Sequence, residues 1–200
     1  RLFGMIVVMF LVVTIVFVIV RVTPGDPAAV MLGPDASAQD IADLRTRLGL
    51  DQSLLVQYFI YLGQMLKGDL GQSIFLNMPV TSALLDRAEP TFFLTVFSLA
   101  IATIIALPIG IYAAYRRGSF VDQAATTIAM LAASIPSFWL GLILMQFFAV
   151  RLNIFPVSGY GGPGSSFMER MYHLTLPAFA LGIVSSALIL RFTRASMLDV

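Results

Sequence analysis

The chain has 200 residues, of which 58% are hydrophobic and 12% are charged, whereas a soluble domain carries about 25% charged residues. This deficit of charge indicates a protein embedded in lipid. The formal net charge of +1 gives no indication of a nucleic-acid partner, and the absence of cysteine excludes disulfides, thiolate metal sites and thiol catalysis. The single histidine, His173, cannot form a zinc site by itself.

Four apolar stretches are long enough to cross a bilayer as helices, since a span takes about 20 residues. They lie near residues 2–20, 91–115, 124–150 and 174–190, and none of them contains Asp, Glu, Lys, Arg or His. We therefore expect an all-α membrane protein, a polytopic helical bundle that forms a single transmembrane domain over residues 1–200.

The first stretch has an alternative interpretation as a cleaved signal peptide. The apolar region of such a peptide is shorter, about 7–15 residues, and small residues at a cleavage site follow it. Here the bulky sequence VIVRVTPGD, at residues 18–26, stands in that place. We therefore favour an uncleaved first span.

The arginines next to the span ends indicate the orientation. With a cytoplasmic N-terminus, the short inner segments hold Arg116, Arg117, Arg191 and Arg194, as the positive-inside rule requires of short loops. The loop 21–90 is too long to count in this rule. We expect it to lie outside, in the periplasm.

A turn is predicted where the first span ends, at Pro24, Gly25, Asp26 and Pro27. Proline fixes its own φ and glycine accepts a positive φ, so Pro24 and Gly25 suit the centre of a type II turn. Pro27 disfavours a helical conformation at Asp26. This corner ends the span and turns the chain along the membrane.

The outer loop 21–90 begins with a predicted helix at residues 37–48. Ser37 and Asp40 have the spacing of a capping box at its start, and Gly49 is a typical stop at its end. The outer loop is therefore expected to be largely helical.

Two further helices are predicted in this loop. Residues 53–66 carry apolar side chains at helical spacing. Residues 79–87, PVTSALLDR, begin with Pro79 and are expected to end before Pro90. The loop helices either lie on the outer membrane surface and cap the bundle, or contact the substrate.

Two absences exclude classes of function. Carriers driven by an ion gradient usually bury charged groups in their spans, and no span here has one. The single lysine, Lys67, follows Leu66, so the Gly-Lys-Ser/Thr core of a phosphate-binding loop occurs nowhere in the sequence. We therefore expect a chain that is not an enzyme and that holds no metal or cofactor.

The candidates for lining a pathway are small polar groups around a proline in the third stretch. Pro136 has no backbone donor, which leaves the carbonyl of Ala132 without its usual helical partner. Ser134 and Ser137 flank this proline, and Gln146 lies further along. The alternative is that Pro136 only kinks a packed helix.

Gly182 and Ser186 in the last stretch form a small-xxx-small pair. Such pairs let the backbones of two helices approach closely in a membrane. We expect this pair to serve helix packing.

Six segments of the chain form a recognisable series. They are TPGDP after the first span, LGLDQSLLVQYFIYLGQMLKGDLGQS at 48–73, RRGSFVDQ at 116–123, SIPSFWLGLILMQFFAV at 134–150, FPVSGYG at 155–161 and LRFTRASMLDV at 190–200. In order and spacing the series resembles the permease subunits of ABC-type peptide importers, the dipeptide, oligopeptide and nickel family, over nearly the whole chain.

The resemblance implies the type I ABC importer permease fold and a translocation pathway for di- or oligopeptides across the bacterial cytoplasmic (inner) membrane. The implied partners are a second homologous permease, two cytoplasmic ATPases that hold ATP and magnesium, and a periplasmic or lipid-anchored substrate-binding protein. Dipeptides, oligopeptides, glutathione and a nickel chelate all stay open as substrates.

The resemblance also suggests roles for four charged residues. The loop helices 37–48 and 53–66 are expected to contact the binding protein, with Asp43 and Arg47 as the docking candidates. Arg191 and Arg194 approach the cytoplasmic loop that seats on the ATPase, or else anchor the last helix at the interface. The family continues past this point with a coupling motif, so the chain is expected to be incomplete at its C-terminus.

Two other functions stay open at this stage. One is a self-sufficient secondary carrier or channel, and the other is a membrane anchor without transport. Uptake that persists without ATP would favour the first, and a deletion that leaves the uptake of every tested peptide intact would favour the second.

Overall fold

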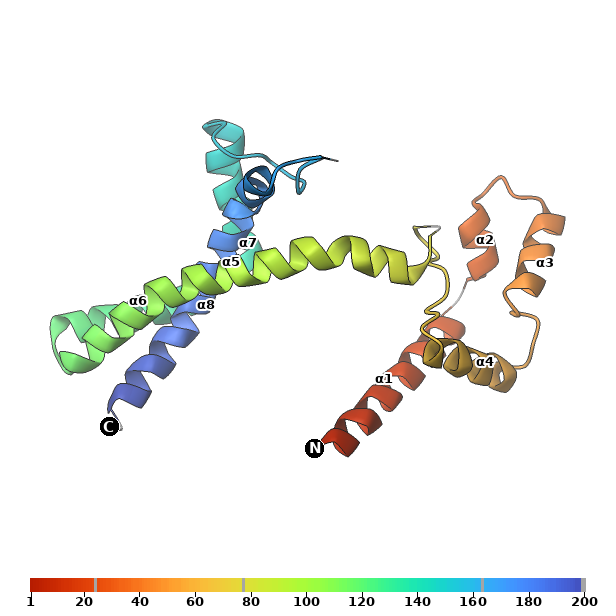
Figure 1. The fold of residues 1–200 in the computed structure, drawn as a ribbon, viewed down its shortest axis with the longest axis horizontal. Helices are drawn as coiled ribbons and strands as arrows, with labels where there is room; N and C mark the ends of the chain where they lie inside the picture. The colour runs from red at the N-terminus through yellow and green to blue at the C-terminus, as the bar shows by residue number, and fades with distance from the viewer. Residues whose placement is uncertain (24, 77, 163, 199–200) are drawn as a thin grey trace. The chain divides into compact units, whose positions relative to one another are not determined.

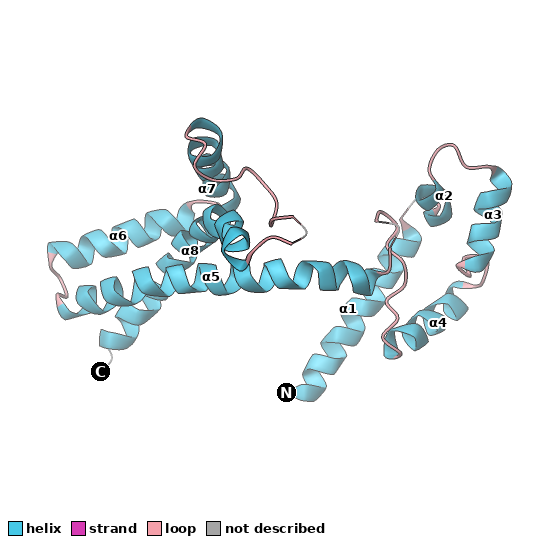
Figure 2. Ribbon diagram, turned by 45° about the horizontal axis from the view of Figure 1, so that its top comes forward, coloured by secondary structure: helices cyan, strands magenta, loops and turns pink. Residues whose placement is uncertain are grey.

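The computed structural model describes residues 1–23, 25–76, 78–162 and 164–198. The regular elements among them are all helical, which confirms the all-α class, and one isolated bridge pairs Gln72 with Pro79 (Figures 1 and 2). The chain divides into two compact units, Arg1–Asp86 and Arg87–Val200.

Helix α1, Leu2–Val22, contains the first predicted span and packs against helix α4, Leu54–Leu66. Phe17 is its buried residue, and the ring of Phe17 lies 5.2 Å from that of Tyr58 and 5.5 Å from that of Tyr61. The hydroxyls of Thr14 and Tyr58 are hydrogen-bonded at 2.6 Å. One face of the second predicted loop helix is therefore covered by the C-terminal half of α1.

The corner after α1 leads into a short helix, α2, Pro27–Leu32. Asp26 is extended, as Pro27 requires, and its carboxylate accepts a hydrogen bond from the N–H of Ala28. The same carboxylate lies 3.6 Å from the guanidinium of Arg45. Pro24 lies outside the described residues, so the type II turn stays a prediction.

Helix α3, Ala38–Arg47, has the predicted capping box. The N–H of Asp40 donates to the hydroxyl of Ser37, and that hydroxyl donates to the carboxylate of Asp40. Gly49 has a φ of +66°, which only glycine adopts at no steric cost, and the chain turns there. Both boundary predictions are confirmed to within a residue.

Helix α5, Val80–Tyr115, is longer than predicted and corrects the expected end before Pro90. Both Pro90 and Pro108 lie inside it. Proline removes one helical hydrogen bond, but hydroxyls can satisfy neighbouring carbonyls. Here the hydroxyl of Thr91 donates to the carbonyl of Arg87 in the affected turn. The third loop helix and the second span are therefore one continuous helix.

The third predicted span, residues 124–150, is not one kinked helix. It consists of α6, Phe120–Ser134, α7, Ser137–Leu144, and a π-helical turn η1, Met145–Arg151, with a bend of 91° between α6 and the rest. Among the described residues, three helices are long and apolar enough to cross a membrane, and a fourth if the bent pair is one span.

Helix α8, Phe167–Leu198, packs against both α6 and α7. The core that joins α5, α6 and α8 consists mainly of small residues, namely Ala106, Ala129, Ala187 and Leu190. Gly182 lies so close to α5 that an added Cβ would be 2.8 Å from Cγ2 of Ile101. This contact confirms that the small residues of the last span serve helix packing.

We predict that Gly182→Ala lowers the stability of the protein in detergent. Besides Ile101, the new methyl group would meet the carbonyl oxygen of Ser98 at 3.0 Å, and such overpacking costs about 1–3 kcal/mol. Thermal unfolding of the purified variant measures the effect. Gly141→Ala is the control, because its Cβ would only touch Ala180 at 3.7 Å. Equal midpoints for the two variants would contradict the prediction.

Candidate functional site

The break between α6 and α7 is made by two extended residues, Ile135 and Pro136. The residue before a proline avoids the helical region, so the chain leaves α6 at Ile135 and restarts after Pro136. The N–H of Ile135 donates to the carbonyl of Ala132 at 3.3 Å, and the N–H of Leu140 donates to the carbonyl of Pro136 at 3.1 Å. The carbonyl of Ala132 lacks its usual partner at position 136, as expected, and accepts from the N–H of Ile135 instead.

Three of the four pathway candidates lie together at this break. Ser134 ends α6 and its hydroxyl donates to the carbonyl of Met130 at 2.9 Å, while Ser137 begins α7 directly after Pro136. The first N–H groups of any helix have no partner within the helix. The break thus places backbone donors beside two serine hydroxyls.

Gln146, the fourth candidate, lies apart from the break in the π-helical turn η1. It lines an open, mainly apolar hollow of about 510 Å³ together with Trp139 and Arg151. Single π-helical turns are frequent at functional sites because they displace side chains from the helical register. The structure does not bring Gln146 to the serines.

A buried ion pair joins the start of α6 to the end of α8. The guanidinium of Arg194 donates to both carboxylate oxygens of Asp122, at 2.5 and 2.8 Å, and Asp122 is only 4% exposed. Gly118 donates its N–H to the same carboxylate at 2.9 Å, and Ser119 caps the helix. Such bidentate pairs fix geometry as well as charge.

The sequence does not predict this ion pair; it places Arg194 either on the approach to the ATPase-coupling loop or at the cytoplasmic interface. Ser119 and Asp122 have the spacing of a capping box, which marks the helix start, but no local pattern connects that turn with α8. Arg191 has no ion pair among the described residues and lines an open hollow of about 290 Å³ with Arg194.

The loop between η1 and α8 is tied to both long helices of its unit. Tyr160 donates its hydroxyl to Glu89 of α5 at 3.2 Å, and Arg170 of α8 pairs with the same carboxylate. Burial raises the pKa of the Tyr160 hydroxyl, and its bond to Glu89 adds to this. Tyr172 donates to the carbonyl of Ile154 at the start of the loop. These bonds tie Tyr160 of the loop to α5 and Ile154 to α8.

The two outer-loop candidates lie on α3. Asp43 is exposed and accepts a hydrogen bond from Gln39 at 3.3 Å, and Arg47 is the last residue of the helix. Arg47 also lines a cavity between α1 and the loop helices. The structure thus places both on one helix.

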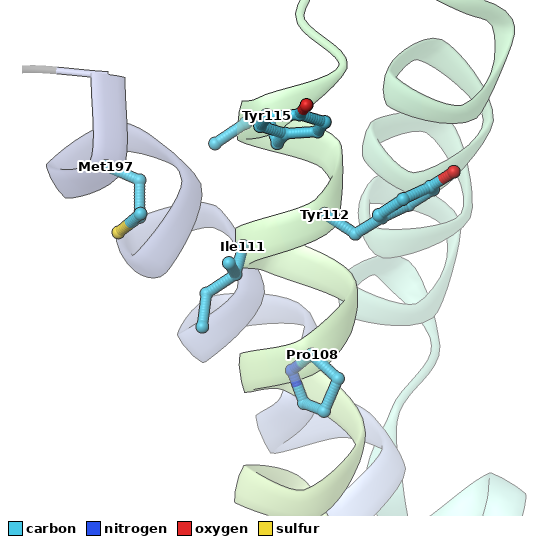
Figure 3. Close-up of a pocket in the computed structure, with 6 residues that line it drawn as sticks. Pro108, Ile111, Tyr112, Tyr115 and Met197 are labelled. Carbon is cyan, nitrogen blue, oxygen red and sulfur yellow. The ribbon is translucent and has the colours of Figure 1, made fainter.

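An apolar hollow of about 500 Å³ lies between the C-terminal parts of α5 and α8. Figure 3 shows Ile111 and Met197 beside it, whereas the ring of Tyr112 points to the other side of α5. The described residues contain no group of three or more His, Asp or Glu side chains that could hold a metal ion. This hollow offers mainly apolar surface.

Two family profiles match the chain. Residues 1–95 match the N-terminal part of the binding-protein-dependent transport system membrane component, and residues 106–200 match the binding-protein-dependent transport system inner membrane component.

Individual relatives match along the whole chain. It is 39% identical over 200 residues to a probable peptide ABC transporter permease, y4tP, of Sinorhizobium fredii, and covers 64% of that protein. It is 40% identical over 200 residues to the glutathione transport system permease GsiC of Escherichia coli O6:H1 and 39% identical to GsiC of Salmonella typhi, covering 63% of each. The chain thus spans less than two thirds of the length of these relatives.

We predict that Arg194→Ala and Asp122→Ala each lower the thermal-unfolding midpoint of the protein by several degrees, because each leaves one charge of the pair uncompensated, the buried carboxylate in the first variant and the partly exposed guanidinium in the second. The double variant should lose no more than either single variant, since the two residues form one interaction. Arg191→Ala is the matched control on the same helix. Additive losses in the double variant would show that the pair does not act as a unit.

Proposed function

We propose that this chain is the permease subunit of an ABC importer for peptides. It belongs to the family of inner membrane components of binding-protein-dependent transport systems. The observation that carries the proposal is the match along all 200 residues to a probable peptide permease and to glutathione permeases. Glutathione is itself a short peptide, so both kinds of relative handle the same chemical class. We place the protein in the bacterial cytoplasmic membrane, with its N-terminus inside.

The energy for uphill transport would come from partner chains. The sequence has no phosphate-binding loop and its spans carry no charge that could couple to an ion gradient. We propose two cytoplasmic ATPases that bind ATP and magnesium, a second homologous permease, and a periplasmic or lipid-anchored binding protein that delivers the peptide. The chain itself would perform no chemical step.

Reconstitution in vesicles tests this proposal. The complete importer, with ATP and the binding protein supplied on the proper sides, should concentrate a radiolabelled dipeptide such as Leu-Leu inside the vesicles. Omission of the ATPases should abolish the accumulation. Accumulation that persists without ATP and collapses with the membrane potential would instead favour a secondary carrier, and no peptide uptake by the complete system would refute the proposal.

We propose that the break at Ile135 and Pro136 lines the pathway. Peptides carry both donors and acceptors, and non-helical backbone at membrane depth is tolerated where it lines a water-filled cavity. The hydroxyls of Ser134 and Ser137 lie at the same point, and Gln146 would contact the substrate at a second point. The pathway would thus recognise peptide groups without any charged side chain.

We predict that Pro136→Ala impairs peptide uptake while the protein still folds. Alanine allows helix α6 to continue through the break, because proline in a helix interior is about 3 kcal/mol less favourable than alanine. Uptake and thermal unfolding should be compared in the same preparation. Pro108→Ala is the control, because Pro108 lies inside the continuous helix α5 and makes no break. Normal uptake by the Pro136 variant would show that the break has only a structural role.

We propose that the outer loop docks the delivering protein through α3, where Asp43 and Arg47 lie. The packing of the two helices supports this assignment, because Tyr58 and Tyr61 of α4 pack against Phe17 of α1 whereas α3 has no buried residue. A photo-cross-linker placed at Asp43 should trap the binding protein during turnover, and one placed at Phe10 on α1 should not. Equal yields at the two positions would argue against docking on α3.

In the second unit, we propose that Arg194 positions the approach to the ATPase. Its pair with Asp122 fixes the last turns of α8 against the turn at residues 116–119. Arg191 remains available for a partner or for lipid phosphates. A cation beside the membrane on the cytoplasmic side accords with the proposed orientation.

A further inference from the structure

A second, separate cavity lies in the first unit, at the point where α1 ends. It has a volume of about 410 Å³ and is bounded by the last turn of α1, the start of α2, the end of α3 and one face of α4. This size lies in the range of small-ligand pockets, about 300–1,000 Å³. None of the pathway candidates in the second unit lines it.

Two arginines and three glutamines stand among the mainly apolar residues that line the cavity, and none of its lining residues is acidic. Arg21 and Arg47 supply the positive charge, and neither has an ion pair among the described residues. The guanidinium of Arg21 is held over the ring of Phe17, 5.3 Å from its centroid. Gln57 and Gln64 add amide groups, so the charge of the cavity favours an anion.

Two buried polar atoms of the lining residues have no hydrogen-bond partner among the described residues. They are Nε of Arg21, a donor, and Oε1 of Gln57, an acceptor. Gln57 is only 8% exposed. Buried polar groups are rarely left unpaired in native proteins. Both side chains also line the cavity, so a ligand bound there would supply partners that the protein itself does not.

The orientation of the Gln57 amide is fixed by its other bonds. Its Nε2 donates to the carbonyl of Gln52 at 2.8 Å and to the carbonyl of Leu50 at 3.3 Å. Both partners are acceptors, so the nitrogen must face them and the oxygen must face away. The unpaired atom is thus an acceptor that requires an N–H.

We infer that this cavity binds the carboxyl terminus of a short peptide. The carboxylate would lie against Arg21 and Arg47, and the N–H of the last residue, a few atoms away along the same chain, would donate to Oε1 of Gln57. Val20, Ile60 and other apolar lining residues would hold an apolar C-terminal side chain. The inference rests on the proposed function, since it assigns this site to a substrate of the importer.

Equilibrium binding tests the inference on the assembled permease and ATPase complex in lipid nanodiscs, without the binding protein. The probes are Leu-Leu and its C-terminal amide, Leu-Leu-NH₂, which lacks only the carboxylate charge. Leu-Leu should bind about tenfold or more tightly than the amide, the loss expected for one charged hydrogen-bonded contact. Arg21→Gln and Arg47→Gln should each weaken the binding of Leu-Leu and leave that of the amide unchanged.

Arg45→Gln is the matched control, because Arg45 lies on the same helix as Arg47 but pairs with Asp26 and does not line the cavity. Equal affinity for acid and amide, or equal losses in all three variants, would overturn the inference. The comparison of acid and amide on the unmodified complex requires no variant to fold. If the complete importer takes up Leu-Leu while these differences are absent, the cavity assignment fails alone; if it takes up no peptide, the proposed function fails.

Discussion

The close approach of α8 to its neighbours is the constraint on which the second unit depends. Helices in lipid gain little from burying apolar side chains, so they associate where small residues let their backbones come near each other. Gly182 meets Ile101 in this way, and Ala106, Ala129 and Ala187 form the shared core of three helices. Larger apolar side chains such as Ile104 are left on the outside, where lipid or other subunits can cover them.

The packed helices α5, α6 and α8 hold an ion pair at one end of α6 and a break in the helix at the other. Its first turn is fixed to α8 by the pair of Asp122 and Arg194, and its last residue, Ser134, precedes the break at Pro136. A helix transmits displacement along its axis because its backbone hydrogen bonds resist bending. Under the proposed function, a movement of the end of α8 would therefore reach the pathway through α6 as a rigid body.

In the first unit, side-chain contacts join the end of the span α1 to the helices of the polar outer loop. The aromatic contact between Phe17 and Tyr58 fixes α4 along the span, and Asp26 caps α2 while it pairs with Arg45. These contacts enclose Arg21 at the end of α1. A cation at this position is ordinary for a membrane helix, but its partial burial without a counterion is not.

The sequence by itself determined the class of the protein, the helices α1 and α3, the capping box at Ser37 and Asp40 and the packing role of Gly182, because each depends on composition or on neighbours within one turn. Tertiary structure decided what depends on distant segments. Pro90 lies inside a continuous helix, whereas Pro136 separates two helices by a bend of 91°. The pair of Asp122 and Arg194 joins segments that only the packing of α8 on α6 brings together, and no local pattern of residues encodes that distance.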